Sequence, residues 1–317
     1  MLTLQDIWEA KKRLIGRIHK TETIYSTSLS AMRKTGVYLK TENLQKTGSF
    51  KVRGAFNKIL TLPPEKRERG VIAFSSGNHG QAVAYAAGNI GIPATVVMPE
   101  WAVINKVNAT KGYGARVILH GKTSMQMEEK AMEIREKEGL EFVHPFDDPM
   151  VMAGQGTLGL EVLESLPDVD TVFVAIGGGG LISGTALAIK SICPKVKIVG
   201  VQPEGSCSML LSRLAGKVVE TDRVDTQADG LTAKRPGELA FAMVEKYVDE
   251  IITVAEDEIM DTLKLVLGRT KLLVEPSGAT SLTGLLSEKV PLGDKNVAVL
   301  SGGNCGFSVL GRSLLEG

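Results

Sequence analysis

Cysteine is scarce in this chain, because 317 residues contain only Cys193, Cys207 and Cys305, at spacings that form no paired motif. Neither a disulfide framework nor a zinc site is therefore expected, which fits a reducing cytoplasm. Charge of one sign is also lacking, since 37 lysine and arginine residues nearly balance 36 acidic residues and leave a formal net charge of +1. Without a basic surplus, we predict no nucleic-acid partner.

Long hydrophobic runs are absent as well. No apolar stretch has the length of a membrane span, and the first six residues show no basic start, apolar core or cleavage motif. We therefore predict a cytoplasmic protein with no membrane partner. What the chain does have is length and a hydrophobic fraction of 43%, which suit two lobes better than one.

Short β-branched runs alternate with longer helical patterns along much of the chain. Runs and helices follow one another at 70–74 and 80–90, 94–98 and 103–111, and 115–119 and 124–138, and further strand-like runs occur at 171–176, 198–201 and 296–300. This rhythm predicts an α/β fold in which each lobe is a mostly parallel twisted sheet flanked by helices. Polar connections near 62–70 and 145–149 indicate a large domain of residues 1–69 and 148–317 and a small domain of residues 70–147.

Lys51 directly follows the aromatic Phe50 in the small-residue stretch Lys46-Thr47-Gly48-Ser49-Phe50-Lys51. A lysine amine held in a confined pocket is a nucleophile that forms a Schiff base with a carbonyl, such as the aldehyde of pyridoxal phosphate. An aromatic neighbour can cover one face of a flat cofactor ring. Most lysines are solvated surface residues, so the segment is weak evidence by itself.

Four consecutive glycines, Gly177 to Gly180, stand between a strand-like run and a helical pattern that starts at Leu181. Their backbone N–H groups can converge on an anion at the positive end of the helix dipole, which predicts a phosphate site. A tight turn needs only one or two glycines. A dinucleotide fingerprint needs an acidic residue ~20 positions later, where this chain has Val199-Gly200-Val201-Gln202.

Two further polar loops follow strand-like runs. Ser75-Ser76-Gly77-Asn78-His79 precedes an alanine-rich helical pattern, and its N–H groups, hydroxyls and amide suit a substrate carboxylate. The alternatives are that a serine only caps the helix and that His79 is a satisfied interior histidine. The second loop, Ser301-Gly302-Gly303-Asn304, also lies at a strand end, where open α/β sheets build their sites.

With these four elements in this order, the chain resembles the fold-type II pyridoxal-phosphate enzymes, whose fold is that of the tryptophan synthase β chain. Threonine dehydratases and serine racemases are the most similar members, and the likeness runs from about Thr21 to Leu310. The resemblance implies that Lys51 is the Schiff-base lysine and Phe50 lies against the pyridine ring. It makes Asn78 the partner of the ring's phenolic oxygen.

The resemblance also assigns the remaining motifs. Gly177, Gly178, Gly179, Gly180 and Leu181 match the phosphate cradle, and Ser301 matches the position near the pyridine nitrogen. Ser75, Ser76, Gly77, Asn78 and His79 match the loop that binds the substrate carboxylate. The implied activity is β-elimination of water from L-threonine and L-serine, with Lys51 as the general base on Cα–H, giving a 2-oxo acid and ammonia.

Two features bear on which member of the family the chain resembles. The run from Ala228 to Glu238 looks like threonine dehydratases, whereas Ser76 stands where serine racemases carry a second acid. Ser76 either returns a proton to the opposite face of the substrate or only forms a local hydrogen bond. Serine racemase and threo-3-hydroxyaspartate ammonia-lyase activities therefore stay open, as does a non-catalytic phosphate-ligand-binding protein on the same scaffold.

A metal site is not predicted. Many relatives bind a divalent cation through acids after a strand, but the corresponding residues here are Gln202 and Ser208, with Glu204 as the nearby acid. Charged oxygen ligands are what hold Mg²⁺ or Ca²⁺, so a strong divalent site is not expected unless Glu204 compensates, and a monovalent ion on carbonyls stays open. The resemblance further implies a homodimer or homotetramer. Because Gly317 follows Asn304 so closely, we expect no C-terminal regulatory domain.

Overall fold

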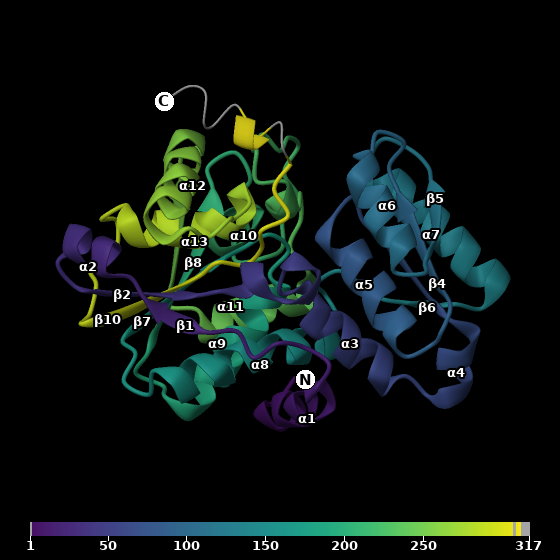
Figure 1. Cartoon of the computed structure of the whole chain (residues 1–317), viewed down its shortest axis with the longest axis horizontal. Coiled ribbons are helices and arrows are strands. Elements are labelled where there is room, and N and C mark those ends of the chain that lie inside the picture. Colours follow the sequence, from purple (N-terminus) through teal and green to yellow (C-terminus); the bar gives the residue numbers. More distant parts are fainter. Residues whose placement is uncertain (1, 307–308, 312–317) are drawn as a thin grey trace. The chain divides into compact units, whose positions relative to one another are not determined.

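The computed structural model describes residues 2–306 and 309–311. By their contacts the residues form two compact units, which are treated separately below (Figure 1). Unit 1 contains Met1–Ile18 and Lys51–Gly154, and unit 2 contains His19–Phe50 and Gln155–Gly317. Within the described residues, no helix is both long enough and apolar enough to cross a membrane.

Unit 1 is built on a parallel four-stranded sheet with the order β5-β4-β3-β6. Its elements are α1 (Leu4–Leu14), α3 (Lys51–Thr61), α4 (Pro64–Arg69), β3 (Val71–Phe74), α5 (Asn78–Asn89), β4 (Ala94–Met98), α6 (Ile104–Gly112), β5 (Arg116–Leu119), α7 (Ser124–Glu138) and β6 (Glu141–Phe142). One apolar cluster joins the strands to α3 and α5, and a second joins them to α7. Helices thus cover both faces of the sheet.

The contacts divide the chain differently from the domains expected from the sequence. Residues 1–18, 51–69 and 148–154 were expected in the large domain, but by their contacts they belong to unit 1. The physical reason is packing, because Leu14 of α1 and Phe56 of α3 share one apolar cluster with Val71 of β3 and Val83 of α5. The polar connection near residues 62–70 therefore lies inside unit 1.

Unit 2 contains a six-stranded sheet with the order β1-β2-β10-β7-β8-β9, parallel except for the antiparallel pair of β1 and β2. Its strands are β1 (Thr23–Tyr25), β2 (Gly36–Lys40), β7 (Thr171–Ala175), β8 (Lys197–Pro203), β9 (Glu250–Val254) and β10 (Lys295–Val299). Its helices are α2 (Thr27–Arg33), α9 (Gly180–Ile192), α10 (Ser208–Ala215), α11 (Glu238–Tyr247), α12 (Glu256–Thr270) and α13 (Pro276–Leu286), with the short 3-10 helices η1 (Glu42–Leu44), η2 (Lys46–Gly48) and η3 (Asp229–Leu231). Helix α8 (Pro149–Ser165) starts in unit 1 and ends in unit 2.

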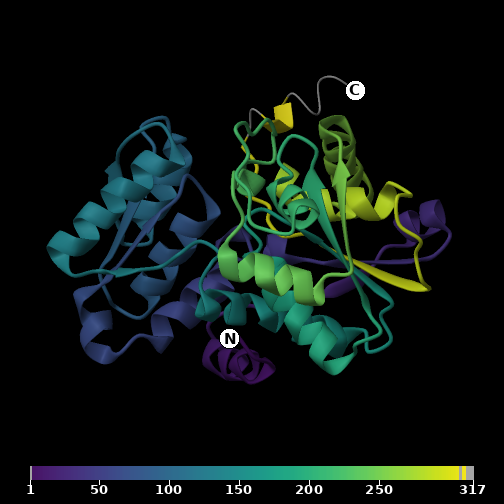
Figure 2. The same ribbon diagram turned by 180° about the vertical axis from the view of Figure 1, so that it is seen from behind.

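Helices flank the sheet of unit 2 on both sides. In the two opposite views, α12 and α13 lie on one side of the sheet and α9 on the other (Figures 1 and 2). The core on the α12 and α13 side combines Ile259 and Leu282 with Val37, Val199 and Ala298 of the strands. The expected α/β architecture, with two mostly parallel sheets flanked by helices, is confirmed.

Candidate active site

Lys51 is the first residue of α3 in unit 1, and Phe50 before it is the last residue of its segment in unit 2. The Lys51 side chain is partly buried, and its Nζ donates a hydrogen bond to the Pro145 carbonyl over 2.8 Å. Pro145 lies in the His-Pro-Phe-Asp stretch that follows β6. A backbone carbonyl thus fixes the direction of the amine within unit 1.

Two histidines lie near Lys51, and burial favours the neutral form of both. His79 is buried and its Nε2 donates to the Val143 carbonyl over 2.8 Å. Burial, followed by the nearby Lys51 charge, lowers the pKa of His79 to about 3. Burial also lowers the pKa of His144 to about 4, although the Asp147 carboxylate acts in the opposite direction.

The neutral form of His144 organises the turn that contains Pro145. Its Nδ1 accepts the backbone N–H groups of Phe146 and Asp147 at 3.2 and 2.7 Å, which requires that this nitrogen carry no proton. The ring also packs edge-on against Phe146, with 4.7 Å between ring centres. The turn thereby holds the carbonyl that accepts from Lys51.

The loop from Ser75 to Gly77 joins the end of β3 to the start of α5. The Ser75 hydroxyl accepts the Gly77 N–H over 3.1 Å, so Ser75 makes the local bond that the sequence left open for Ser76. Within the described residues the Ser76 hydroxyl has no hydrogen-bond partner. Asn78 and His79 belong to the first turn of α5, whose leading N–H groups have no intrahelical acceptor.

A lysine that the sequence analysis missed borders this loop. The Lys106 ammonium, from α6, lies 3.5 Å from the position that a Cβ on Gly77 would take. No motif connects residues that are so far apart in the chain. The loop thus combines helix N–H groups with a neighbouring cation, both of which favour an anion.

In unit 2 the four glycines run from the end of β7 into α9. Gly179 is the N-cap residue of α9 with φ of 101°, and a Cβ there would lie 2.7 Å from Met209 Cε and 2.8 Å from Ala240 Cβ. A Cβ on Gly177 would lie 3.1 Å from the Gly230 carbonyl oxygen. The bare backbone at the start of a 13-residue helix leaves N–H groups without intrahelical acceptors, which fits a phosphate.

The segment before Lys51 pairs with the loop after β10, also in unit 2. Ser49 and Gly302 form an antiparallel bridge, and the Phe50 N–H donates to the Ser301 carbonyl over 3.1 Å. The buried Ser301 hydroxyl in turn donates to the Ser277 carbonyl over 3.3 Å. Two motifs about 250 positions apart in the sequence are therefore neighbours through their backbones.

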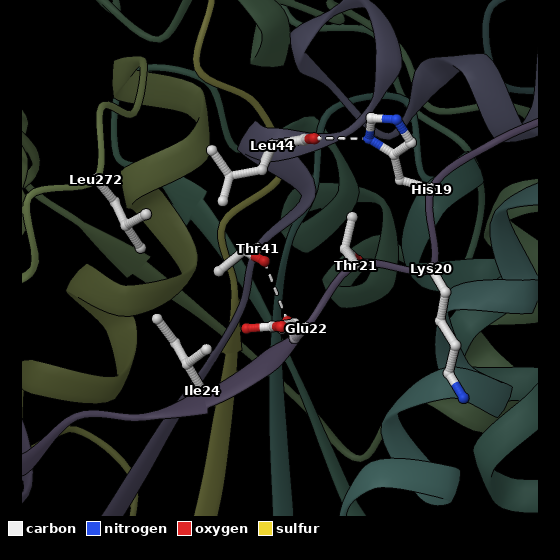
Figure 3. Close-up of a pocket in the computed structure, with 8 residues that line it drawn as sticks. All are labelled: His19, Lys20, Thr21, Glu22, Ile24, Thr41, Leu44 and Leu272. Atoms are coloured by element: carbon white, nitrogen blue, oxygen red, sulfur yellow. Dashed lines mark hydrogen bonds between the residues drawn. The ribbon is translucent and has the colours of Figure 1, made fainter.

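A surface depression elsewhere in unit 2 contains none of these residues. Its volume is about 380 Å³, and its lining includes the polar groups of His19 and Glu22 and the apolar side chains of Ile24, Leu44 and Leu272 (Figure 3). The His19 ring approaches the Leu44 carbonyl at 3.3 Å. This depression is therefore not the site that the motifs predict. The described residues also contain no group of three or more His, Cys, Asp or Glu that could hold a metal ion.

Mostly parallel sheets in both units, a lysine at one helix start and four glycines at another fit the class of α/β enzymes that use a phosphate-bearing cofactor. The family model of pyridoxal-phosphate dependent enzymes matches residues 15–303, and the chain belongs to this family. Its sequence is 48% identical over 317 residues to that of the L-threonine ammonia-lyase of Thermotoga maritima. The matched region covers 100% of this chain and 79% of that protein.

Two further comparisons agree with the family assignment. The catabolic L-threonine dehydratase TdcB of Escherichia coli is 45% identical over 310 residues, covering 97% of this chain and 94% of that protein. The solved structure of maize serine racemase has a TM-score of 0.95 at 38% identity, covering 99% of this chain and 97% of that one. The chain is thus similar both to ammonia-lyases and to a racemase.

Proposed function

We propose that the protein is a pyridoxal-phosphate-dependent ammonia-lyase that eliminates water from L-threonine, and also from L-serine. The products are 2-oxobutanoate or pyruvate, with ammonia. The observation that carries the proposal is the 48% identity, over the whole chain, to an L-threonine ammonia-lyase. The environment of Lys51 supports it, since a directed amine beside neutral histidines suits a base.

We assign proton transfer to Lys51, which would hold the cofactor through its aldehyde and would be free to act as a base once the substrate amine has displaced it. Pyridoxal phosphate, when bound, withdraws electrons from the substrate Cα and weakens its C–H bond. Lys51 Nζ takes that proton. His79 and His144 do not compete for it near neutral pH, because their pKa values are about 3 and 4. The Pro145 carbonyl keeps the amine aimed.

We assign cofactor binding to the remaining motifs. The N–H groups of Gly177, Gly178, Gly179, Gly180 and Leu181 bind the phosphate, as the bare backbone at Gly179 allows. By the resemblance, Phe50 would contact the ring, Asn78 would hydrogen-bond its phenolic oxygen, and Ser301 would lie near its nitrogen. A hydroxyl at Ser301, unlike a carboxylate, does not hold that nitrogen protonated, which favours early loss of the β-hydroxyl.

We assign the substrate carboxylate to the loop from Ser75 to His79. His79 contributes its backbone N–H rather than its ring, because Nε2 already donates to Val143. The N–H groups at the start of α5 and the Lys106 ammonium supply the positive field. This assignment needs no further charged side chain from the loop itself.

Serine racemase activity is the second candidate, because the Ser76 hydroxyl has no partner among the described residues. A hydroxyl that is not engaged locally can return a proton to Cα. The 38% identity to maize serine racemase favours the same possibility. Elimination and racemisation share the first proton transfer, so one protein can perform both.

A substrate panel tests the proposal. The purified protein with pyridoxal phosphate is given L-threonine, L-serine, D-serine and threo-3-hydroxyaspartate, and the 2-oxo acids and the chirality of serine are measured. We expect 2-oxobutanoate from L-threonine at the highest kcat/KM. Oxaloacetate formed faster from hydroxyaspartate would replace the proposal by the alternative lyase, and D-serine formation would establish the second candidate. No turnover and no borohydride-trapped cofactor would leave a phosphate-ligand-binding protein.

We also propose that the protein forms a homodimer or homotetramer and works in the cytoplasm. Apolar side chains at the surface of unit 2 support association, since Leu44 and Tyr25 are 56% and 55% exposed. Light scattering during size-exclusion chromatography measures the subunit number. A monomer at micromolar concentration would contradict the proposal.

A further inference from the structure

The loop between β8 and α10 contains a buried amide whose orientation is fixed by its surroundings. Gln202 is fully buried, and its Oε1 accepts the Leu210 N–H over 2.9 Å in the first turn of α10. An N–H can only donate, so the oxygen of the amide must face Leu210. Its Nε2 therefore faces the carbonyl oxygens of Ile176 and Ser206, each 3.3 Å away.

This arrangement does not fit a divalent cation at Gln202 and Ser208, the positions at which the resemblance would place one. A cation needs several oxygens turned toward it, including charged ones. Here the side chain turns its NH2 group toward the two carbonyls, and one N–H is available for each. The Ser208 hydroxyl donates to the Ala233 carbonyl over 2.7 Å. Glu204 is exposed and forms an ion pair with the Lys289 ammonium at 3.9 Å.

The loop between β8 and α10 forms hydrogen bonds to two segments that adjoin Gly177, the first glycine of the cradle. Ile176, which accepts from Gln202, immediately precedes Gly177. The Ser206 hydroxyl donates to the Leu231 carbonyl over 2.6 Å, and a Cβ on Gly177 would contact Leu231 Cα at 3.3 Å. The Gln202 and Ser206 side chains together thus link the residue before the first glycine of the cradle to the segment that packs against that glycine.

We propose that Gln202 is a positioning residue for the phosphate cradle and that its amide takes the place of a bound cation at this loop. Two neutral N–H donors hold the carbonyls of Ile176 and Ser206 together, as a positive ion would. The protein therefore needs no divalent or monovalent ion for this loop to be ordered. The inference rests on the proposed function only for the identity of the anion in the cradle.

The substitution Gln202→Glu reverses the polarity at one atom with little change in shape. The carboxylate can still accept from Leu210, but its second oxygen then faces two carbonyl oxygens. We expect the thermal unfolding midpoint of the apoprotein to fall in EDTA by about 3 °C or more. Addition of Ca²⁺ or Mg²⁺ should restore the midpoint. In EDTA, the variant should also bind pyridoxal phosphate about tenfold more weakly than the wild type does, and the same ions should tighten this binding.

Two matched variants separate charge from packing. Gln202→Met removes the hydrogen bonds without adding an acid, so its midpoint should fall and should not respond to either ion. Glu204→Gln removes the exposed acid of the same loop and should behave like the wild type. For the wild type, EDTA should not lower the midpoint. The chlorides of Na⁺, K⁺, Mg²⁺ and Ca²⁺ should shift it no more than tetramethylammonium chloride does at equal ionic strength.

The apoprotein measurements stay informative if the proposed reaction is wrong, because they need no substrate. A wild-type midpoint that falls in EDTA, or metal retained in a one-to-one ratio after dialysis, would overturn the inference. So would a Gln202→Glu protein with the wild-type midpoint in EDTA and no response to Ca²⁺. If Gln202→Glu folds only when Ca²⁺ is present during refolding, the inference is supported.

Discussion

The candidate residues of the two units differ in their chemistry. In unit 2 the groups are neutral: bare glycine N–H groups, the Ser301 hydroxyl and the Gln202 amide. In unit 1 they are titratable side chains, with Lys51 beside His79 and His144. The comparison teaches that the glycine backbone of unit 2 carries no titratable side chain, whereas the groups whose protonation changes with pH, His79 and His144, lie in unit 1.

The largest effect is expected from removal of Lys51, which tests the role that the comparison gives to unit 1. In Lys51→Ala, kcat for 2-oxobutanoate formation should fall by roughly 10⁴-fold or more, since general base and covalent attachment are lost together. Borohydride should no longer trap cofactor on the protein. Fluorescence titration should still detect some pyridoxal phosphate binding, because the glycine cradle is intact. Residual activity within tenfold of wild type would refute the role of Lys51.

Acid should destabilise unit 1 through its buried histidines. Their folded pKa values, about 3 for His79 and about 4 for His144, lie below the ordinary value of 6.5. The unfolded chain therefore binds more protons between pH 6.5 and pH 4, and folding stability is fully present above pH 6.5 and falls as the pH drops through this window. We expect about 1.4 kcal/mol per pH unit for each histidine at most.

Urea unfolding at a series of pH values measures this dependence. His144→Asn should make the pH dependence shallower by one proton, since one of the two histidines is then absent. The pH dependence of the unfolding free energy should arise in unit 1. As the pH falls, hydrogen exchange in α3 and α5 should therefore accelerate at a higher pH than exchange in α9. An earlier loss of protection in α9 would break the comparison between the units.

A methyl group in the cradle tests the unit 2 half. In Gly179→Ala, the Cβ would meet Met209 Cε at 2.7 Å and Ala240 Cβ at 2.8 Å, with φ at 101°. Overpacking of this kind costs about 1–3 kcal/mol and should weaken pyridoxal phosphate binding about tenfold or more. KM for substrate should change less than the cofactor affinity.

Gly268→Ala is the matched control in the same unit. Nothing lies within 4 Å of the Cβ that would be added in α12, and alanine is a better helix former by up to about 1 kcal/mol. Cofactor affinity should stay unchanged while the unfolding midpoint rises slightly. Equal losses of affinity in both variants would show that the effect at Gly179 is not local.

The turn around Pro145 gives the smallest expected effect. His144→Ala removes the acceptor of the Phe146 and Asp147 N–H groups, so the carbonyl that directs Lys51 is less well held. We expect kcat to fall about tenfold with little change in KM. Asparagine can accept the same N–H groups, so His144→Asn should recover most of kcat. A KM effect alone would place the turn in substrate binding.

Much of the fold could be predicted from the sequence because its strands are buried on both faces. The apolar run 71–74 and the mostly apolar run 94–98 are recognisable in the sequence because glycine or proline residues lie beside them. The strands β1, β2, β6 and β9 were not predicted. They are short or lie near sheet edges, where alternating and partly exposed residues give a weak pattern.

The parts of the site that could be predicted are those whose chemistry is contained in one short segment. Four glycines between a strand and a helix, or a lysine after an aromatic, can be recognised in the sequence alone. The Pro145 carbonyl, the His144 turn and Lys106 were missed, because each acts on a group at least 29 positions away. Only long-range contacts bring such groups together.

By itself, the sequence determined the α/β class, the order of the motifs and the residues with special backbone or side-chain chemistry. These follow from local periodicity and from what glycine, lysine and serine can do. Only the tertiary structure decided that both histidines near Lys51 are neutral, that Ser75 rather than Ser76 makes the local bond, and that the Gln202 amide faces two carbonyls. Burial and hydrogen-bond direction depend on neighbours distant in the chain, and they fix the protonation and orientation of each group.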